Sequence, residues 1–192
     1  MARQGNLYVI SGPSGAGKGT LVARLLERVP DAWVSVSATT RAPRAGEVDG
    51  VQYYFMTDGQ FDDLVAQDGF LEWANVHTAK YGTPRASVEE HIAAGEQVIL
   101  EIDVQGGFQV KEKFPSCHLV FIEPPSMEIL LERLRGRGTE PEDVIAARMK
   151  VAQVELQQKM KYDYTVVNDD LEEATQKLVA YIEDQATGNY EG

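Results

Sequence analysis

One stretch of the sequence indicates the fold most directly, and it reads Ser11-Gly12-Pro13-Ser14-Gly15-Ala16-Gly17-Lys18-Gly19-Thr20. An apolar run precedes it at residues 7–10, and a helical pattern that opens at Leu21 follows it. The pattern Gly-x-x-x-x-Gly-Lys between a strand and a helix is typical of a phosphate-binding loop. Glycines allow backbone N–H groups to curl around phosphate oxygens, and Lys18 can reach the β- and γ-phosphates as a point charge. The stretch therefore predicts a nucleoside triphosphate site.

The position after Lys18 departs from the usual form of this loop. A Ser or Thr there normally gives its hydroxyl to magnesium, whereas this chain has Gly19 followed by Thr20. The Gly-Lys-Gly-Thr order resembles that of adenylate kinases. We therefore expect Mg²⁺ to enter with ATP, held through phosphates and water, with Thr20 as a candidate ligand. The residues expected to bind ATP are Gly12, Pro13, Ser14, Gly15, Ala16, Gly17, Lys18, Gly19 and Thr20.

Short apolar runs alternate along the chain with longer amphipathic stretches. The runs lie at residues 7–10, 97–102, 118–122 and 164–167. Uninterrupted apolar strands are typical of a parallel sheet that is covered on both faces. Helical patterns fill the intervals, at residues 20–29, 105–113, 127–134, 141–160 and 171–185. This alternation predicts an α/β core.

Two stretches interrupt the alternation. Residues 35–91 are rich in turns, include an alternating segment at 51–55, and place Thr57 and Gln60 at the spacing of a helix capping box. They predict a small mixed lobe inserted into the core. Residues 135–141 are glycine-rich and separate two helical patterns, which predicts a mobile lid.

Composition limits the remaining classes of function. A formal net charge of −12 over 192 residues argues against a surface that grips nucleic acid or anionic lipid, so a polyanion site must be a local basic pocket. The single cysteine, Cys117, excludes an internal disulfide and is expected to be a buried thiol in a cytoplasmic protein. The apolar run at residues 7–10 is too short for a signal peptide or a membrane span. The histidines lack metal-ligand spacing, at His77, His91 and His118.

Several blocks resemble the guanylate kinase family, in that family's order and along nearly the whole chain. The first reads Ser35-Val36-Ser37-Ala38-Thr39-Thr40-Arg41-Ala42-Pro43-Arg44-Ala45-Gly46-Glu47. Later blocks lie at residues 69–74, 81–83, 102–106 and 167–170. The resemblance implies direct transfer of the γ-phosphoryl group of ATP to GMP, and to dGMP, giving GDP and dGDP.

Pattern and resemblance together predict an α/β P-loop kinase fold with a parallel core sheet, an inserted mixed α/β lobe for the nucleoside monophosphate and a small helical lid. We expect the core at residues 1–36, 91–125 and 159–192. The GMP-binding lobe is expected at residues 37–90, and the lid at residues 126–158. The expected partners are the small molecules ATP and GMP, with neither nucleic acid nor membrane, and the sequence indicates no oligomeric state.

The resemblance also implies an acceptor site. It assigns the GMP phosphate to Arg41, Arg44, Tyr53 and Tyr81, and the guanine to Ser37, Glu72, Thr83 and Asp103. The residue types agree, since arginines on either side of an Ala-Pro turn offer planar forks to a phosphate dianion. Read alone, the arginines could also form a solvated turn and the tyrosines could pack in the lobe. Glu72 could equally lie on the polar face of a strand.

Two departures from the family pattern restrict what is carried over. The family usually has Asp-x-Asp where this chain has Glu101-Ile102-Asp103, so Glu101 either orders magnesium-bound water or completes a polar network. The family commonly has a second tyrosine before Tyr81, whereas this chain has Lys80. We therefore assign only Tyr81.

Basic residues in the lid are the expected cations of the transfer step. The resemblance implies that Arg137 and Arg148 touch the transferring phosphoryl and that Arg135 lies near the ATP base or ribose. Asn168 is also expected in the ATP site. The catalytic set predicted is Lys18, Arg41, Arg137 and Arg148. The alternative for the lid arginines is helix-surface ion pairing with Glu132, Glu140 or Glu142.

Two other functions remain open at this point. A monophosphate kinase with another acceptor, such as AMP, is compatible with the Gly19-Thr20 order. A guanylate-kinase-like binding module, which holds phosphopeptides without chemistry, is compatible with the lobe. Such modules typically have degraded phosphate loops, whereas this chain keeps Gly17 and Lys18, so the enzyme is favoured.

Overall fold

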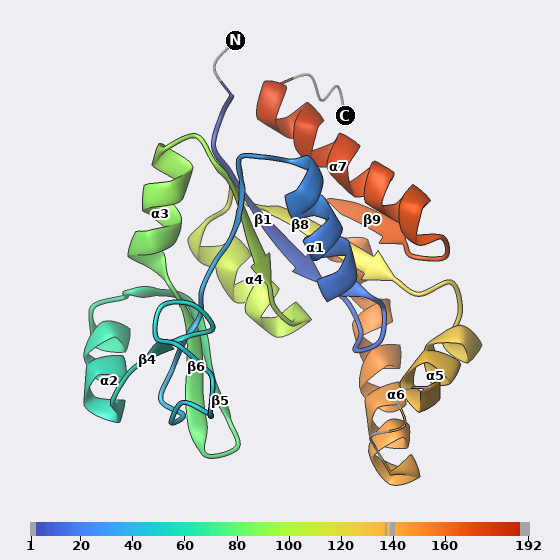
Figure 1. Cartoon of the computed structure of the whole chain (residues 1–192), viewed down its shortest axis with the longest axis horizontal. Helices are drawn as coiled ribbons and strands as arrows, with labels where there is room; N and C mark the ends of the chain where they lie inside the picture. Colours follow the sequence, from blue (N-terminus) through green and yellow to red (C-terminus); the bar gives the residue numbers. More distant parts are fainter. Residues whose placement is uncertain (1–2, 137, 139–140, 189–192) are drawn as a thin grey trace.

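A parallel sheet forms the centre of the molecule (Figure 1). The computed structural model describes residues 3–136, 138 and 141–188. The sheet has the strand order β2-β7-β1-β8-β9, with β2 at Ala32–Val34, β7 at Gln97–Glu101, β1 at Asn6–Ser11, β8 at His118–Glu123 and β9 at Tyr164–Val167. Every pairing in it is parallel. The predicted α/β class is therefore confirmed.

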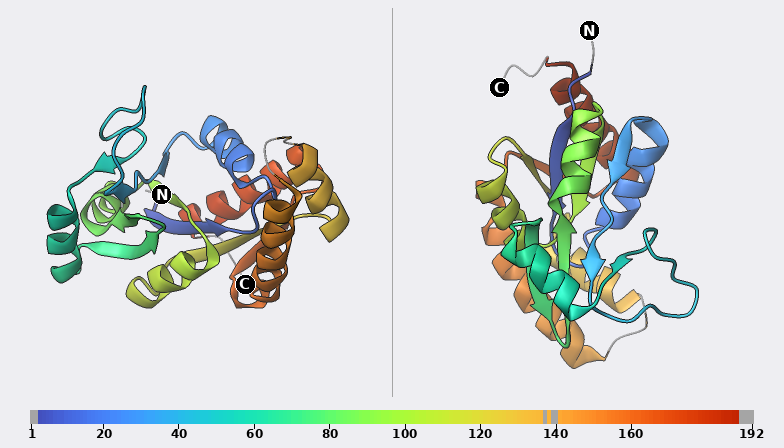
Figure 2. Two further views of the ribbon diagram at one scale, coloured as in Figure 1. Left: turned by 90° about the horizontal axis from the view of Figure 1, so that it is seen from below. Right: turned by 90° about the vertical axis from the view of Figure 1, so that its left-hand side faces the viewer.

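Helices cover both faces of this sheet (Figure 2). They are α1 Lys18–Arg28, α3 Arg85–Ala93, α4 Val104–Lys113 and α7 Leu171–Thr187. Because side chains alternate along a strand, Tyr8 and Ile10 pack in one cluster with α1 and α7, while Leu7 and Val9 pack in the other with α3 and α4. Burial on both faces explains why these strands have uninterrupted apolar sequences.

A second, mixed sheet forms a lobe at one side of the core. Its strand order is β4-β3-β6-β5, with β4 at Tyr54–Phe55, β3 at Ala38–Thr39, β6 at Ala79–Pro84 and β5 at Phe70–Val76. The helix α2, Asp58–Ala66, packs on it through Phe61, which stacks on Phe70 with ring centroids 4.3 Å apart. The Thr57 side chain accepts from the Gln60 N–H and the Gln60 side chain accepts from the Thr57 N–H, which confirms the predicted capping box.

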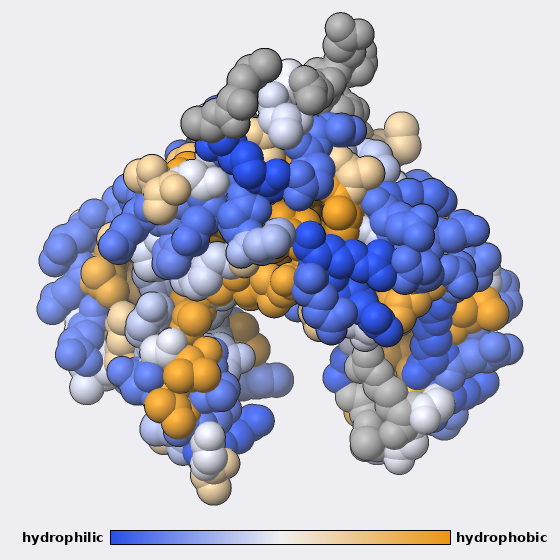
Figure 3. Space-filling view, turned by 45° about the horizontal axis from the view of Figure 1, so that its top comes forward, coloured by the Kyte–Doolittle hydropathy of each residue, from blue (hydrophilic) through white to orange (hydrophobic). Residues whose placement is uncertain are grey.

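A pair of helices projects on the other side, α5 at Met127–Gly136 and α6 at Glu142–Gln157. Leu130, Leu134, Ile145 and Ala152 form their small shared core. In the space-filling view an open gap separates this helical limb from the lobe (Figure 3). The two limbs therefore face each other across a cleft with the central sheet at its base.

Some sequence-based boundaries were wrong. The first helix begins at Lys18 rather than at Leu21, because the left-handed Gly17 (φ 90°) ends the loop there and the first helical turn has no apolar residue to mark it. The alternating segment 51–55 is strand only at Tyr54–Phe55, since Val48 to Tyr53 is folded into turns. The pattern at 141–160 ends as helix at Gln157 and continues as a 3-10 turn, η1 Lys159–Lys161.

Candidate active site

The phosphate loop leaves the carboxyl end of the central strand β1 and enters α1. Gly12, Gly15 and Gly17 all have positive φ, at 147°, 91° and 90°. A Cβ on Gly12 would lie 2.2 Å from the carbonyl oxygen of Ile122, and one on Gly17 would lie 2.3 Å from Nδ2 of Asn168. Only glycine meets both the backbone conformation and the close packing at these two positions. The loop thus has a backbone that requires glycine, and it stands at the carboxyl edge of the sheet, where ligands of such sheets bind.

Side chains from several elements meet at this loop. The Lys18 ammonium donates to the Gly12 carbonyl and, at 3.2 Å, to the Pro13 carbonyl. Arg148 reaches it from α6, with Nη1 donating to Ser14 Oγ at 2.6 Å. Asn168, 5% exposed, donates from Nδ2 to the Ala16 carbonyl at 2.7 Å. The structure therefore places Asn168 behind the loop, as a support for its backbone.

The predicted acceptor-phosphate residues gather in the lobe. The Arg41 guanidinium lies over the rings of Tyr53 and Phe55, at 5.4 and 5.8 Å from their centroids. Tyr53 and Tyr81 meet edge to face at 5.9 Å. Arg44 is exposed on the adjoining turn. Three of the four predicted side chains, those of Arg41, Tyr53 and Tyr81, thus form one cluster.

The predicted guanine-binding residues come from the lobe, except for Asp103, which caps α4 in the core. Glu72 on β5 is 8% exposed and accepts a hydrogen bond from the Thr83 hydroxyl of β6 at 2.7 Å. Burial raises the pKa of the Glu72 carboxyl, the Thr83 hydrogen bond opposes this, and the Asp103 charge adds to it. Asp103 caps α4, where Oδ1 accepts from the Gly106 N–H at 2.8 Å. Ser37 directly precedes β3, where its carbonyl accepts from the Tyr54 N–H.

The Glu101 carboxylate and the Thr20 hydroxyl mark the candidate metal region beside the loop. The Glu101 carboxylate oxygens lie 3.7 and 3.8 Å from where a Cβ on Gly19 would stand, and Thr20 is exposed in the same turn of α1. Oxygen donors of this kind suit Mg²⁺. Within residues 3–136, 138 and 141–188, no group of three or more His, Cys, Asp and Glu side chains is arranged to hold a metal ion.

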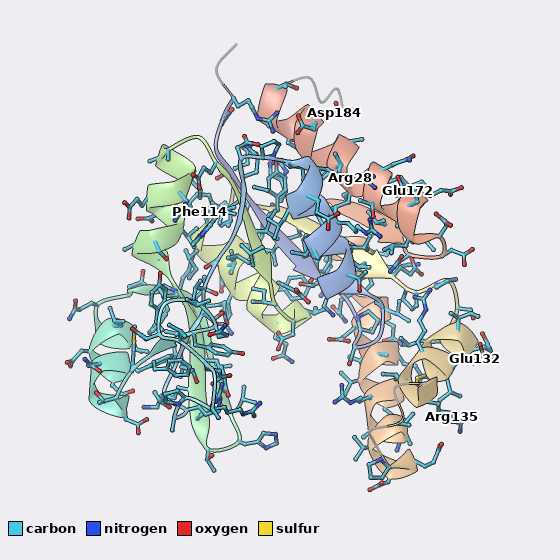
Figure 4. All side chains as sticks on the ribbon, viewed as in Figure 1. Arg28, Phe114, Glu132, Arg135, Glu172 and Asp184 are labelled. Carbon is cyan, nitrogen blue, oxygen red and sulfur yellow. The ribbon has the colours of Figure 1, made fainter. Side chains whose placement is uncertain are left out.

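The predicted lid arginines differ in their position relative to the loop. Arg135, labelled on α5 in Figure 4, forms an exposed bidentate pair with Glu142, with N···O distances of 3.0 and 2.8 Å. In this arrangement Arg135 makes the helix-surface ion pair that was the alternative interpretation. Arg137 lies outside the described residues. Of the two predicted lid arginines that the structure describes, Arg148 is the one that reaches the phosphate loop.

Two acidic residues near these groups were missed by sequence reasoning. Glu47, inside the first family block, binds the Arg41 guanidinium. Glu155 on α6 lines, together with Asp103, a groove of about 1140 Å³ between α4 and α6. Burial raises the pKa of Glu155, and the Lys18 charge opposes the shift. The acidic residue next to two arginines was a signal for Glu47, whereas a helix-surface pattern gives none for Glu155.

Comparisons of the sequence and of the structure with known proteins all match this chain to one family. A model of the family described as "Guanylate kinase" matches residues 4–185. A guanylate kinase of Synechocystis sp. is 55% identical over 93% of this chain and 94% of its own length, and one of Synechococcus sp. is 52% identical over 97% and 100%. The crystal structure of guanylate kinase from Anaplasma phagocytophilum superposes with a TM-score of 0.73 at 33% identity, covering 96% of this chain and 87% of that one. Separately, none of the helices described is long and apolar enough to cross a membrane.

Proposed function

Because the chain belongs to the guanylate kinase family and transfers the γ-phosphoryl group of ATP to GMP, we propose that the cleft between lobe and lid is where this transfer takes place. The observation that carries the proposal is the arrangement of cations around the cleft. Lys18 and Arg148 lie at the phosphate loop, and the Arg41 cluster lies in the facing lobe. Two anionic substrates can therefore approach each other from opposite sides.

The donor side consists of the loop and Lys18. Backbone N–H groups of residues 12–17 and the N-terminus of α1 would surround the ATP phosphates, with Thr20 in the same helical turn. Lys18 would exchange its carbonyl partners for the β- and γ-phosphate oxygens. Asn168 acts through the loop, by holding the Ala16 carbonyl. Arg135 would contact the ATP base or ribose once its ion pair with Glu142 is broken.

The acceptor side consists of two subsites in the lobe. Arg41, Arg44, Tyr53 and Tyr81 would bind the GMP phosphate, because the Arg41 guanidinium and the Tyr53 and Tyr81 rings cluster there and Arg44 lies on the adjoining turn. Glu72 would accept from guanine N1–H and the exocyclic amine, with Ser37, Thr83 and Asp103 around the base. None of these assignments uses the ribose 2′-hydroxyl, so we propose that dGMP is an acceptor as well.

The chemical step needs alignment and positive charge more than a base. The attacking atom is already a phosphate oxygen, so no proton has to be removed from a hydroxyl. Charge on the equatorial oxygens of the moving phosphoryl would be met by Lys18, Arg137 and Arg148, while Arg41 fixes the attacking phosphate. The four residues therefore form the proposed catalytic set.

Mg²⁺ fits the donor side, because the oxygen donors of Glu101 and Thr20 lie close to Gly19. When bound with ATP it would neutralise negative charge on the phosphate groups. Glu101 and Thr20 would hold its water shell, since the Glu101 carboxylate at the end of β7 lies near Gly19 and Thr20 follows Gly19 in the first turn of α1. The loop itself offers no hydroxyl at Gly19.

We further propose a division of labour along the chain and a location for the protein. Residues 1–36, 91–125 and 159–192 would act as the core, residues 37–90 as the GMP-binding lobe and residues 126–158 as the lid. A cytoplasmic protein agrees with the single buried Cys117 thiol, whose pKa burial raises to about 11.

Acceptor choice is tested by a coupled assay of ADP release with ATP and Mg²⁺ and with GMP, dGMP, AMP, UMP and CMP in parallel. We expect activity with GMP and dGMP that exceeds activity with the others by several orders of magnitude. Equal activity with all five acceptors would contradict the assignment of Glu72, and activity with GMP alone would contradict the dGMP proposal.

The role of Lys18 is tested by Lys18→Ala. We expect turnover to fall by about 10³ or more, because single cations at a transferring phosphoryl are worth roughly 10³ to 10⁵ in rate. Thermal unfolding of the variant checks that the chain still folds. A loss of less than about tenfold would place Lys18 away from the reacting phosphoryl.

A further inference from the structure

Glu47 makes several hydrogen bonds in the acceptor lobe, with both Arg41 and Arg44. Its carboxylate accepts from Arg41 Nη1 at 3.0 Å through Oε2 and from Arg41 Nη2 at 2.9 Å through Oε1. The same Oε2 accepts from the backbone N–H of Arg44 at 2.7 Å. The Glu47 N–H donates back to the Arg44 carbonyl at 3.1 Å. One carboxylate therefore fixes both a guanidinium and the turn that carries the second arginine.

The pairing leaves a defined part of the guanidinium for another ligand. A guanidinium presents an end-on fork, Nη1 with Nη2, and a side-on fork, Nε with Nη2. Glu47 takes the end-on fork, and the other Nη1 hydrogen goes to the Ala42 carbonyl at 2.8 Å. The side-on fork takes no part in the contacts with Glu47 and Ala42. That fork has the geometry that binds two oxygens of a phosphate.

Aromatic neighbours complete the support of the same side chain. The Tyr53 and Phe55 rings lie against the guanidinium, and the ion pair with Glu47, together with the neighbouring Tyr81 hydroxyl, raises the pKa of Arg41. The Arg41 and Glu47 side chains are 20% and 17% exposed. Arginine otherwise loses much rotamer freedom on binding, and a side chain that is ordered in advance avoids most of that cost.

We propose that Glu47 is a positioning residue for the acceptor nucleotide: its carboxylate holds the end-on fork of Arg41 so that the side-on fork is presented to the phosphate of GMP. The proposal rests on the proposed phosphate-binding role of Arg41. The chemical class recognised is a nucleoside monophosphate dianion, and Glu47 itself does not touch it.

Glu47 could instead weaken GMP binding, so the direction in which GMP affinity changes on its removal distinguishes the two roles. Hydrogen bonds from Arg41 and from the Arg44 backbone lower the pKa of Glu47, so it is ionised at neutral pH and could compete with the phosphate for the guanidinium. A competitor would weaken GMP binding, and its removal would strengthen it. A positioning residue would strengthen GMP binding, and its removal would weaken it. Positioning is favoured because the carboxylate occupies only one fork and also closes the turn.

The test is isothermal titration of GMP and of guanosine, which lacks the phosphate, into wild type and Glu47→Gln. We expect the dissociation constant for GMP to rise about three- to tenfold, the cost of ordering one long side chain on binding. The dissociation constant for guanosine and the KM for ATP should stay unchanged. Unchanged or tighter GMP binding, or equal weakening for guanosine, would overturn the proposal.

A matched control is available elsewhere in the chain. Arg28 of α1 and Glu172 of α7 form the same bidentate pair, with N···O distances of 2.9 and 2.7 Å, outside the cleft (Figure 4). Glu172→Gln should leave GMP binding unchanged. Glu47→Asp serves as a second variant: the shorter carboxylate keeps its charge but cannot span the same contacts, so weakening similar to that of Glu47→Gln assigns the effect to geometry.

Arg41→Lys separates failure of this inference from failure of the proposed function. An ammonium keeps the charge but has no forks, so Arg41→Lys should weaken GMP binding, and adding Glu47→Gln should then change it by less than about twofold. If Arg41→Lys leaves GMP binding intact, the phosphate assignment itself is wrong. If Arg41→Lys weakens binding and Glu47→Gln does not, only the positioning role is wrong.

Discussion

Glu72 combines two properties that oppose each other in the free protein. Its carboxylate is almost fully buried, with the Thr83 hydroxyl as a hydrogen-bond donor and with the Asp103 charge nearby. Burial of a charge with incomplete partners is unfavourable. Guanine would supply the missing donors through N1–H and the exocyclic amine, whereas adenine would turn a lone pair toward the anion. The same carboxylate that costs stability in the free protein would therefore select the base.

Glu72→Gln separates these two effects. We expect GMP use to weaken by roughly 2–4 kcal/mol in transition-state binding, with ATP binding nearly unchanged, because one acceptor becomes a donor. The measurement is kcat/KM for GMP and for AMP in competition. A GMP preference equal to that of wild type would show that the base is read elsewhere.

The pH dependence of stability gives a second readout of the same variant. The folded pKa of Glu72 is raised, so its favourable contribution is present below the unfolded pKa and is lost as pH rises through the folded value. At pH 7 the Gln variant avoids this loss and should melt at a higher temperature than wild type. The difference should shrink as pH falls toward the ordinary range of glutamate. A Gln variant that is less stable at pH 7 would contradict the prediction.

Two glycines of the phosphate-binding segment, Gly12 and Gly19, differ in whether the structure requires glycine there. Gly12 has a φ of 147° and no space for a Cβ, because the Ile122 carbonyl is in the way. Gly19 lies inside α1, without a positive φ, and the nearest atoms to its Cβ position are the Glu101 carboxylate oxygens at 3.7 and 3.8 Å. Glycine is therefore needed at the first position for geometry and is not sterically needed at the second.

A matched pair of variants tests this difference. Gly12→Ala should destabilise the fold by about 2–4 kcal/mol through strain and overpacking, and should raise the KM for ATP. Gly19→Ser should keep magnesium dependence and change activity less than about threefold, since helix propensity favours Ser over Gly. Urea unfolding and initial rates check both. Complete loss of activity in Gly19→Ser would show that the loop needs glycine there.

At the level of the whole molecule, function depends on two limbs, the lobe and the α5–α6 pair, which face each other across a cleft (Figure 3). The helix α4 links the core to the lobe, because Lys113 donates to the Asp68 carboxylate at 2.6 Å and to the Phe70 carbonyl at 2.8 Å. On the other side Arg148 joins α6 to the phosphate loop. Direct transfer requires the attacking oxygen of GMP to lie within about 3–3.5 Å of the γ-phosphorus of ATP and in line with the bond that breaks. We therefore expect the limbs to approach each other when both nucleotides bind.

Arg137→Ala tests whether the lid acts mainly in that closed state. We expect turnover to fall by about 10² or more while the dissociation constant for GMP changes little, since a lid cation contributes chiefly in the transition state. Single-turnover rates and GMP titration provide the two numbers. Loss of GMP affinity at unchanged turnover would move Arg137 to ground-state binding.

Much of this protein follows from local sequence. The phosphate loop between strand and helix, the apolar strands and the α/β class depend on short-range chemistry: glycines for backbone freedom, a lysine at a fixed offset, and apolar runs for strands buried on both faces. Thr57 and Gln60 specified their capping box for the same reason. The family blocks predicted the acceptor residues, because motif residues keep their order along the chain.

The tertiary structure alone decided which of these residues are neighbours and what supports them. Glu47 holding Arg41, Asn168 supporting the loop, Arg148 reaching Ser14 and the burial of Glu72 all depend on how the lobe, core and lid pack. Helix and strand periodicity fixes which face of an element is apolar, but not which polar group on another element that face meets. Long-range pairs are set by the way the sheets and helices pack on each other, since a buried polar group needs a hydrogen-bond partner and any element packed against it can supply one.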